Sequence, residues 1–175
     1  MQRWCASGRL QLNADKTEFI WIGSAVNLEC LQTDPVGLTI ADVNVKAVDC
    51  VRDLGIHLDS QLDLRTHISR IVSTCYFHLR RMRHPRHIVS HETQQCLVSA
   101  LILSRIDYGN VIFAGLPQVT LAPLRRVMNA AVHFVMGLLC LRDHVTAAWH
   151  ELHWLPSDQC IIYKLCILMH ADLLT

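Results

Sequence analysis

The sequence predicts a mixed α+β fold, in which a small antiparallel sheet is followed by a bundle of four or five helices. Two observations support this prediction. Between residues 9 and 59, short apolar segments separated by turn residues are typical of strands. From Asp63 onward, apolar residues recur every three or four positions, as they do on the buried face of a helix. The change of pattern predicts two domains, residues 1–60 and residues 61–175.

The bulk composition is that of a folded protein without a membrane span. Of the 175 residues, 51% are hydrophobic, and only 7 are Gly and 5 are Pro, which excludes a disordered tail. The longest nearly apolar run, residues 127–141, is interrupted by Asn129 and His133 and is too short to cross a bilayer. The first residues lack the apolar core of a signal peptide. We therefore expect an intracellular protein, nuclear or cytoplasmic, that does not bind a membrane.

The eight cysteines are scattered, and no two of them have the spacing Cys-X-X-Cys. Zinc sites and redox motifs use closely spaced pairs. Several of the cysteines occupy apolar positions, where a thiol behaves as a small hydrophobic group. The pattern predicts reduced cysteines within a core.

In the first domain, turn residues separate the expected strands. Residues 1–7 are typical of the end of a helix, stopped by Gly8 in the left-handed conformation. Residues 13–15 favour a turn, and the apolar run 19–22 after it predicts a buried strand with Lys16 at its entry. Residues 25–35 predict a loop. Residues 38–40, 43–48 and 51–59 predict further strands, with Gly55 at a bulge or a close backbone approach in the last.

In the second domain, five helices are expected. The stripe of the first helix comprises Ile68, Ile71, Val72, Cys75, Leu79 and Met82. Pro85 ends this helix, and Ser90 is the expected N-cap of the second, which Gly109 stops. The stripe of the third comprises Leu121, Leu124, Met128, Ala131, Val135 and Leu138. A short helix is expected over residues 145–152, and a final one begins near Pro156.

The charge of the chain is unevenly distributed, although its net value is only +1. Residues 64–91 hold six Arg, five His and no acid, whereas the chain before and after this segment carries both signs. Such a local basic block is typical of a surface that binds phosphate. The arginines of the block are Arg65, Arg70, Arg80, Arg81, Arg83 and Arg86.

On a helical wheel, Arg70, Phe77 and Arg81 fall together on the side opposite the apolar stripe, with His84 close by. A phenylalanine between two arginines can stack on a base while the guanidinium groups hold phosphates. Alternatively, Phe77 packs on a neighbouring helix or on a missing part of the protein, and the arginines form a solvated face. The candidate nucleic-acid-binding residues in this block are Arg70, Phe77, Arg80, Arg81, Arg83 and Arg86.

Seven segments, in order along nearly the whole chain, carry a resemblance to a known family. They are Gly8-Arg-Leu-Gln-Leu-Asn-Ala-Asp-Lys-Thr-Glu18, Val51-Arg-Asp-Leu-Gly-Ile-His-Leu-Asp59, Phe77-His-Leu-Arg-Arg-Met-Arg83, Ser104-Arg-Ile-Asp-Tyr-Gly-Asn110, Gly115-Leu-Pro117, Arg126-Val-Met-Asn-Ala-Ala131 and Leu152-His-Trp-Leu-Pro156. With these segments the chain resembles the C-terminal palm and thumb region of reverse transcriptases of non-LTR (LINE-like) retrotransposons. It departs from the family's pattern at Cys5, where Met is frequent, and at Gly109, where Cys is usual.

The resemblance implies that the first domain is a palm remnant and that the second is a thumb-like region lying against an RNA/DNA duplex. It implies that Lys16 corresponds to a lysine acting as general acid toward the leaving pyrophosphate. It also implies that Gly55 and His57 belong to a primer-grip strand, where glycine lets the backbone approach the primer end. Other interpretations are that Lys16 is an exposed lysine in a turn and that Gly55 and His57 lie in an ordinary core strand.

The sequence lacks the acidic pair that polymerases of this class use in catalysis. Nucleotidyl transfer needs carboxylates that hold two Mg²⁺ ions, and the sequence contains no Asp-Asp pair. Asp15, Asp53 and Asp59 are isolated from one another. We therefore expect no catalytic residue beyond a vestigial Lys16, no bound metal and no cofactor, since Mg²⁺ belongs to a complete member of the family.

Histidines offer a weaker alternative, a zinc site. His84, His87 and His91 are separated by three and four positions, and His150 and His153 by three. Metal ligands on helices have the same spacings. However, Pro85 interrupts the first set, and the second is one residue short of the His-Glu-X-X-His arrangement. We expect no zinc site.

These observations predict a partial, reverse-transcriptase-like protein from a mobile element, inactive on its own but able to bind RNA or DNA. The alternative is a non-enzymatic helical interaction module, or a translated fragment without a function. An exposed sheet edge and an apolar palm face would also favour binding of the missing palm segment, or self-association.

Overall fold

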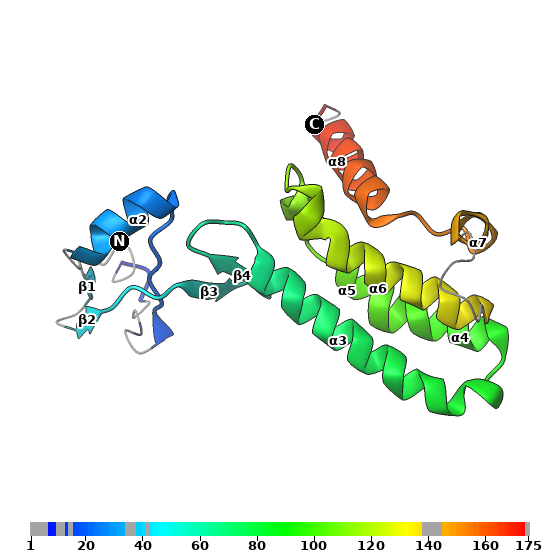
Figure 1. The fold of residues 1–175 in the computed structure, drawn as a ribbon. Coiled ribbons are helices and arrows are strands. Elements are labelled where there is room, and N and C mark those ends of the chain that lie inside the picture. The colour runs from blue at the N-terminus through cyan, green and yellow to red at the C-terminus, as the bar shows by residue number, and fades with distance from the viewer. Residues whose placement is uncertain are drawn as a thin grey trace. The chain divides into compact units, whose positions relative to one another are not determined.

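The computed structural model describes residues 7–9, 13, 16–33, 38–40, 43–137 and 145–173 (Figure 1). The chain divides into two units, Met1–Leu64 and Arg65–Thr175. Within the described residues, the first unit contains short strands and the helix α2, and the second is built of helices, so the predicted α+β class is confirmed. None of the helices within the described ranges is long and apolar enough to cross a membrane.

The first unit contains two small antiparallel sheets where the sequence predicted one. Strands β1 (Leu38–Ile40) and β2 (Val43–Val45) pair with Thr39 opposite Asn44, and β3 (Cys50–Asp53) and β4 (Ile56–Asp59) pair with Val51 opposite Leu58. Each sheet of the described residues therefore has only two strands. The strand expected over residues 51–59 is instead a hairpin.

Gly55 lies in the turn of this hairpin and not at a bulge. Leu54 and Gly55 have φ values of 45° and 87°, the left-handed conformations that a two-residue hairpin turn with matching strand twist requires. Glycine adopts such a φ without strain. The prediction of one continuous strand was wrong because the turn begins with leucine, a residue that favours strand over turn.

Two other predictions for the first unit were wrong. Residues 19–22 form no strand, since Phe19 makes a single parallel bridge to Ala47, and Ile22 is 55% exposed. The predicted loop over residues 25–35 is largely a helix, α2 (Ala25–Thr33). The Ser24 hydroxyl accepts a hydrogen bond from the Asn27 amide at the start of this helix, as an N-cap does. The apolar residues of α2 have no helical periodicity, so the sequence pattern did not predict this helix.

At the beginning of the chain, the predicted end of a helix lies mostly outside the described residues. The left-handed conformation expected of Gly8 occurs one residue later, at Arg9, with φ 55°.

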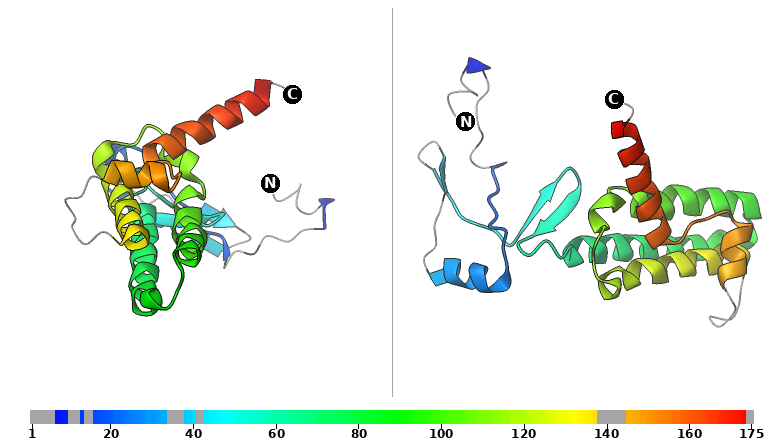
Figure 2. Two further views of the ribbon diagram at one scale, coloured as in Figure 1. Left: turned by 90° about the vertical axis from the view of Figure 1, so that its right-hand side faces the viewer. Right: turned by 90° about the horizontal axis from the view of Figure 1, so that it is seen from above.

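The second unit begins with α3 (Arg65–Arg83), which packs along α6 (Gln118–Met136); the two run side by side in Figures 1 and 2. Between them in sequence lie α4 (His91–Val98), a π-helical turn η3 (Ser99–Leu103), α5 (Ser104–Asp107) and a 3-10 turn η4 (Asn110–Phe113). The first three of these form the second predicted helix. Two further helices, α7 (Val145–Glu151) and α8 (Ser157–Leu173), complete the described unit.

The predicted starts and stops of these helices are confirmed. A 3-10 turn, η2 (His84–His87), contains Pro85 and follows α3. The Ser90 hydroxyl accepts a hydrogen bond from the Thr93 amide at 3.3 Å and so caps α4. Gly109 is left-handed with φ 65° and ends α5. Leu138, the last residue of the stripe predicted for α6, lies outside the described residues.

The core of the second unit lies between α3, η3, η4 and α6. Its largest fully buried apolar side chains are Phe113, Ile102, Leu124, Val98, Val127, Val132 and Cys75. Burial raises the pKa of the Cys75 thiol to about 11, so this cysteine stays protonated. Cys30, Cys96 and Cys166 are exposed, so the prediction of core cysteines was wrong for these three.

Candidate nucleic-acid interface

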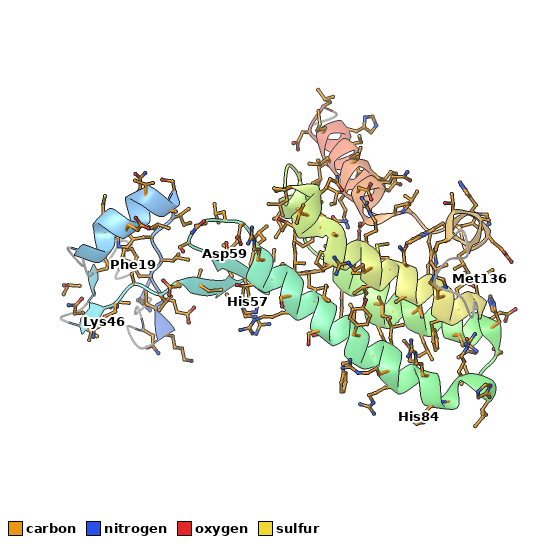
Figure 3. The ribbon with its side chains drawn as sticks, viewed as in Figure 1. Phe19, Lys46, His57, Asp59, His84 and Met136 are labelled. Atoms are coloured by element: carbon orange, nitrogen blue, oxygen red, sulfur yellow. The ribbon has the colours of Figure 1, made fainter. Side chains whose placement is uncertain are left out.

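Helix α3 presents two different faces, because its apolar residues recur every three to four positions. The buried face comprises His67, Ile68, Ile71, Cys75, Leu79 and Met82. Arg70, Phe77, Arg80, Arg81 and Arg83 are exposed; together they are called the basic face of α3 below. His84 follows at the end of the helix (Figure 3).

Phe77 is 47% exposed, on the outside of α3. The guanidinium carbon of Arg81, one turn further along α3, lies 5.5 Å from the centroid of its ring. This distance is typical of a cation–π contact. The pair therefore places an aromatic ring and a positive charge together on the exposed side of the helix.

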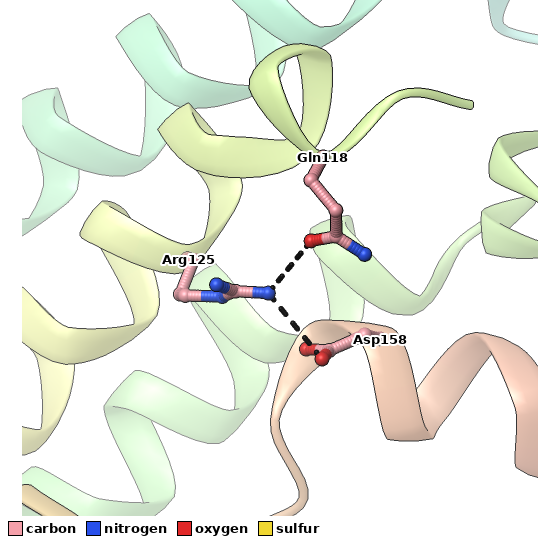
Figure 4. Close-up of polar contacts among 3 residues, drawn as sticks. All are labelled: Gln118, Arg125 and Asp158. Carbon is pink, nitrogen blue, oxygen red and sulfur yellow. Dashed lines mark hydrogen bonds and ion pairs between the residues drawn. The ribbon is translucent and has the colours of Figure 1, made fainter.

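The arginines of the basic face have no acidic partner within the described part of the chain. Among the described residues, ion pairs join Arg125 to Asp158 and Lys164 to Asp107, and none involves Arg70, Arg80, Arg81 or Arg83. Arg125 also donates a hydrogen bond to the Gln118 side chain, which fixes the start of α6 to the start of α8 (Figure 4). Within the described residues, no acid therefore neutralises the positive charge of the basic face, whereas Arg125 and Lys164 are each paired with an acid.

Arg86 is half-buried, unlike the other candidates of the block, and its nucleic-acid-binding role stays a prediction. Its guanidinium carbon lies 5.6 Å from the ring centroid of Phe134 on α6. The Gln94 amide donates hydrogen bonds to the carbonyl oxygens of Arg86 and Val89. A Cβ atom added to Gly137 would lie 2.7 Å from the Arg86 Nη2 atom, so glycine leaves the room that this arginine occupies. Arg86 anchors η2 to α6.

Gly55 and His57 belong to the first unit, at the turn of the β3–β4 hairpin and within β4. His57 is half-buried opposite Arg52. Lys16 is exposed, and its amide donates a hydrogen bond to the Asn13 carbonyl oxygen at 3.2 Å. A vestigial catalytic role of Lys16 stays a prediction, as does a primer-grip role of Gly55 and His57.

The carboxyl groups of Asp59 and Asp63 form a hydrogen-bonded pair at the end of β4. Burial raises the pKa of Asp59 above its ordinary value, and the hydrogen bond and negative charge of Asp63 raise it further. The Asp59 carboxylate also accepts a hydrogen bond from the Leu64 amide at 3.3 Å, just before α3 begins. The pair joins the hairpin to the residues that lead into α3.

Replacing Asp59 with Asn should stabilise this region at neutral pH. A raised folded-state pKa means that folding favours the protonated form, so the stabilisation is present below the unfolded pKa of about 4 and is lost as the pH rises through the folded pKa. Asparagine imitates the protonated acid and still accepts from Leu64. Amide hydrogen exchange of β3 and β4 should be slower in Asp59→Asn than in the wild type at pH 7. The difference should disappear near pH 3.

Among the residues that the structure describes, no group of three or more His, Cys, Asp or Glu side chains is placed to hold a metal ion. The predicted histidine spacings therefore converge on no such site within these ranges. Sequence reasoning missed a cavity of about 410 Å³ beside α5 and α8, lined by Leu103, Ile106, Asp107, Asn110, Trp154 and Tyr163 among others. Its residues come from segments far apart in the sequence, so no local pattern could reveal it.

Comparison of the chain with protein-family models, with curated proteins and with solved structures finds no match.

Proposed function

We propose that this chain is a partial, reverse-transcriptase-like protein derived from a mobile element, which binds RNA/DNA duplex through the basic face of α3. The observation that carries the proposal is that this face combines four exposed arginines with an exposed Phe77, and that no described acid pairs with those arginines. Duplexes attract such surfaces by releasing counterions from their phosphates. The seven segments that resemble the palm and thumb of LINE-like reverse transcriptases support the choice of duplex.

Salt dependence tests the proposal directly. Four arginine–phosphate contacts should give a slope of log K against log salt of roughly −3 to −4, shallower than the −4 to −5 expected if all six arginines of the block took part. The measurement is fluorescence anisotropy of a labelled RNA–DNA hybrid, titrated with the full chain between 50 and 200 mM KCl. Absence of salt-sensitive binding at 50 mM would contradict the proposal and favour the non-enzymatic interaction module.

Phe77 is expected to add a stacking contact to single-stranded or frayed ends. Stacking of a base on an aromatic side chain is worth about 1–3 kcal/mol. Phe77→Ala should therefore weaken binding of a short single-stranded DNA roughly 5- to 150-fold, and Phe77→Trp should preserve it. Tyr108→Ala, which removes an exposed aromatic ring outside the basic block, serves as the matched control. Equal losses for Phe77→Ala and Tyr108→Ala would assign Phe77 no role in stacking.

In this proposal the chain binds nucleic acid without performing catalysis. The sequence offers no Asp-Asp pair, so no pair of Mg²⁺ ions is expected to stabilise the attacking and leaving oxygens. We expect no magnesium-dependent primer extension by the full chain on an RNA template. Extension that is lost on replacement of the chain's own Asp53 or Asp59 would overturn this expectation. Extension restored by a palm segment added in trans would instead support the partial nature of the protein.

A further inference from the structure

The cavity beside α5 and α8 is large enough to hold a small organic molecule. Its volume of about 410 Å³ falls within the range of about 300–1,000 Å³ that is typical of ligand sites. Leu103, Ile106 and Met128 make part of its wall apolar, and its lining residues all belong to the second unit. Leu103 is part of the π-helical turn η3, and such turns are frequent at functional sites. The polar residues of the wall then decide which ligand the cavity suits.

Asp107 is the acidic residue of this wall, and no lysine or arginine is among the described residues that line the cavity. Its Oδ1 atom accepts a hydrogen bond from the Asn110 side-chain amide at 2.9 Å, and its Oδ2 atom pairs with Lys164, which lies outside the lining. A carboxylate has about four acceptor sites, so Asp107 can accept further hydrogen bonds. Its side chain is 52% exposed, so a ligand can reach it.

Cys160, on α8, also lines the cavity and indicates the sign of the local charge. Burial raises the pKa of its thiol, and the negative charge of Asp107 raises this pKa further, by more than the positive charge of Lys164 lowers it. The Asn110 Oδ1 atom is buried in the same region and has no hydrogen-bond partner among the described residues. Both observations indicate that the surroundings of the cavity favour a positive charge and hydrogen-bond donors.

Two aromatic side chains, Trp154 and Tyr163, complete the wall. The Trp154 ring packs edge-on against that of Trp149 with 6.5 Å between the centroids, and its amide donates a hydrogen bond to the Trp149 carbonyl oxygen at 3.1 Å. Because Trp149 is only 8% exposed, these contacts hold Trp154 in place before any ligand arrives. Aromatic rings pack against other aromatic rings and attract cations over their faces.

We propose that this cavity binds a small aromatic amine, with the ammonium group against Asp107 and the ring against Trp154 and Tyr163. The ammonium group would donate a charge-assisted hydrogen bond to the carboxylate, and the apolar part of the wall would cover the ring. A ligand that carries phosphate or carboxylate fits less well, because Asp107 would repel it and no lysine or arginine among the described lining residues would attract it.

Three compounds that share an indole ring test the charge preference. Tryptamine carries an ammonium group, tryptophol a neutral hydroxyl and indole-3-acetate a carboxylate. Titration of the full chain at pH 7, followed by amide chemical shifts in NMR, should give a dissociation constant for tryptamine on the order of 1 mM or below. Tryptophol should bind about 10-fold more weakly, and indole-3-acetate more weakly still. The amides that shift should be those of residues 103–110 and 153–163.

Asp107→Asn separates the charge from the shape of the cavity. Asparagine still accepts from Asn110 but carries no charge, so the variant should bind tryptamine about 10-fold more weakly and tryptophol nearly as well as the wild type does. Unchanged tryptophol binding shows at the same time that the cavity is intact. Glu92→Gln, which removes an exposed acid of α4 outside the lining, is the matched control and should not alter tryptamine binding.

Tyr163→Ala tests the aromatic wall. It should weaken tryptamine binding roughly 2- to 30-fold, whereas Tyr108→Ala, at a similarly exposed tyrosine outside the lining, should have no effect. Equal binding of the three indoles, or amide shifts confined to other residues, would overturn the proposal. So would an Asp107→Asn variant that binds tryptamine as tightly as the wild type. The cavity shares no residue with the basic face of α3, so failure of this proposal leaves nucleic-acid binding unaffected.

Discussion

Replacing Arg70, Arg80, Arg81 and Arg83 together by Gln should remove most of the salt dependence of duplex binding. With four phosphate contacts, the wild type should lose about 100-fold in affinity between 50 and 200 mM salt. The variant should lose less than about 5-fold over the same range, because few counterions remain to be released. The measurement is the anisotropy titration at four salt concentrations.

The substitutions should leave the fold intact. All four side chains are exposed, and Gln has nearly the helix propensity of Arg. The matched control compares two double variants of equal charge. One variant combines Arg80→Gln and Arg81→Gln, and the other combines Arg105→Gln and Arg126→Gln. Arg105 and Arg126 are exposed on α5 and α6, outside the basic face. Equal flattening of the slope by the two double variants would show that the chain attracts nucleic acid through its overall charge and not through α3.

Replacing Phe113 with Ala should destabilise the second unit by about 3–5 kcal/mol, the typical cost of removing a buried phenyl ring. Phe113 is 1% exposed, and its ring lies 5.9 Å from that of His67 on α3. The substitution would leave a cavity between η4 and the helix that carries the basic face. Urea unfolding followed by circular dichroism at 222 nm measures this loss, because the helical signal comes mainly from the second unit.

Val119→Ala is the control for this experiment. Val119 is 85% exposed on α6, and its truncation should change the free energy of unfolding by less than about 0.5 kcal/mol. A loss below about 1 kcal/mol for Phe113→Ala would contradict the packing of η4 against α3 described above.

The helices of the second unit could be predicted because their signals are local. Ser90, Pro85 and Gly109 cap or stop helices through interactions within a few residues, and the stripe of α3 reports the 3.6-residue period directly. The first unit was predicted less well. The turn at Leu54 and Gly55 contains no Asn or Asp from which it could be predicted. Helix α2 lacks an apolar stripe, so hydrophobic periodicity could not predict it.

Part of the candidate interface could be predicted because its signal, like that of the helices, is local. Periodicity placed Arg70, Phe77 and Arg81 on one side of a helix, and the structure leaves them exposed. The charge pattern could not separate Arg86 from its neighbours, because its contact is with Phe134, on a helix distant in sequence.

By itself, the sequence determined the α+β class, the helix boundaries around α3 and α4, and the concentration of arginine without acid in residues 64–91. These features follow from backbone geometry and charge within one or two turns. The tertiary structure alone decided which arginines remain exposed, which one lies over an aromatic ring, and that apolar side chains of α8 stay exposed. Exposure depends on which distant segments come to lie beside a residue, and a local pattern does not contain that information.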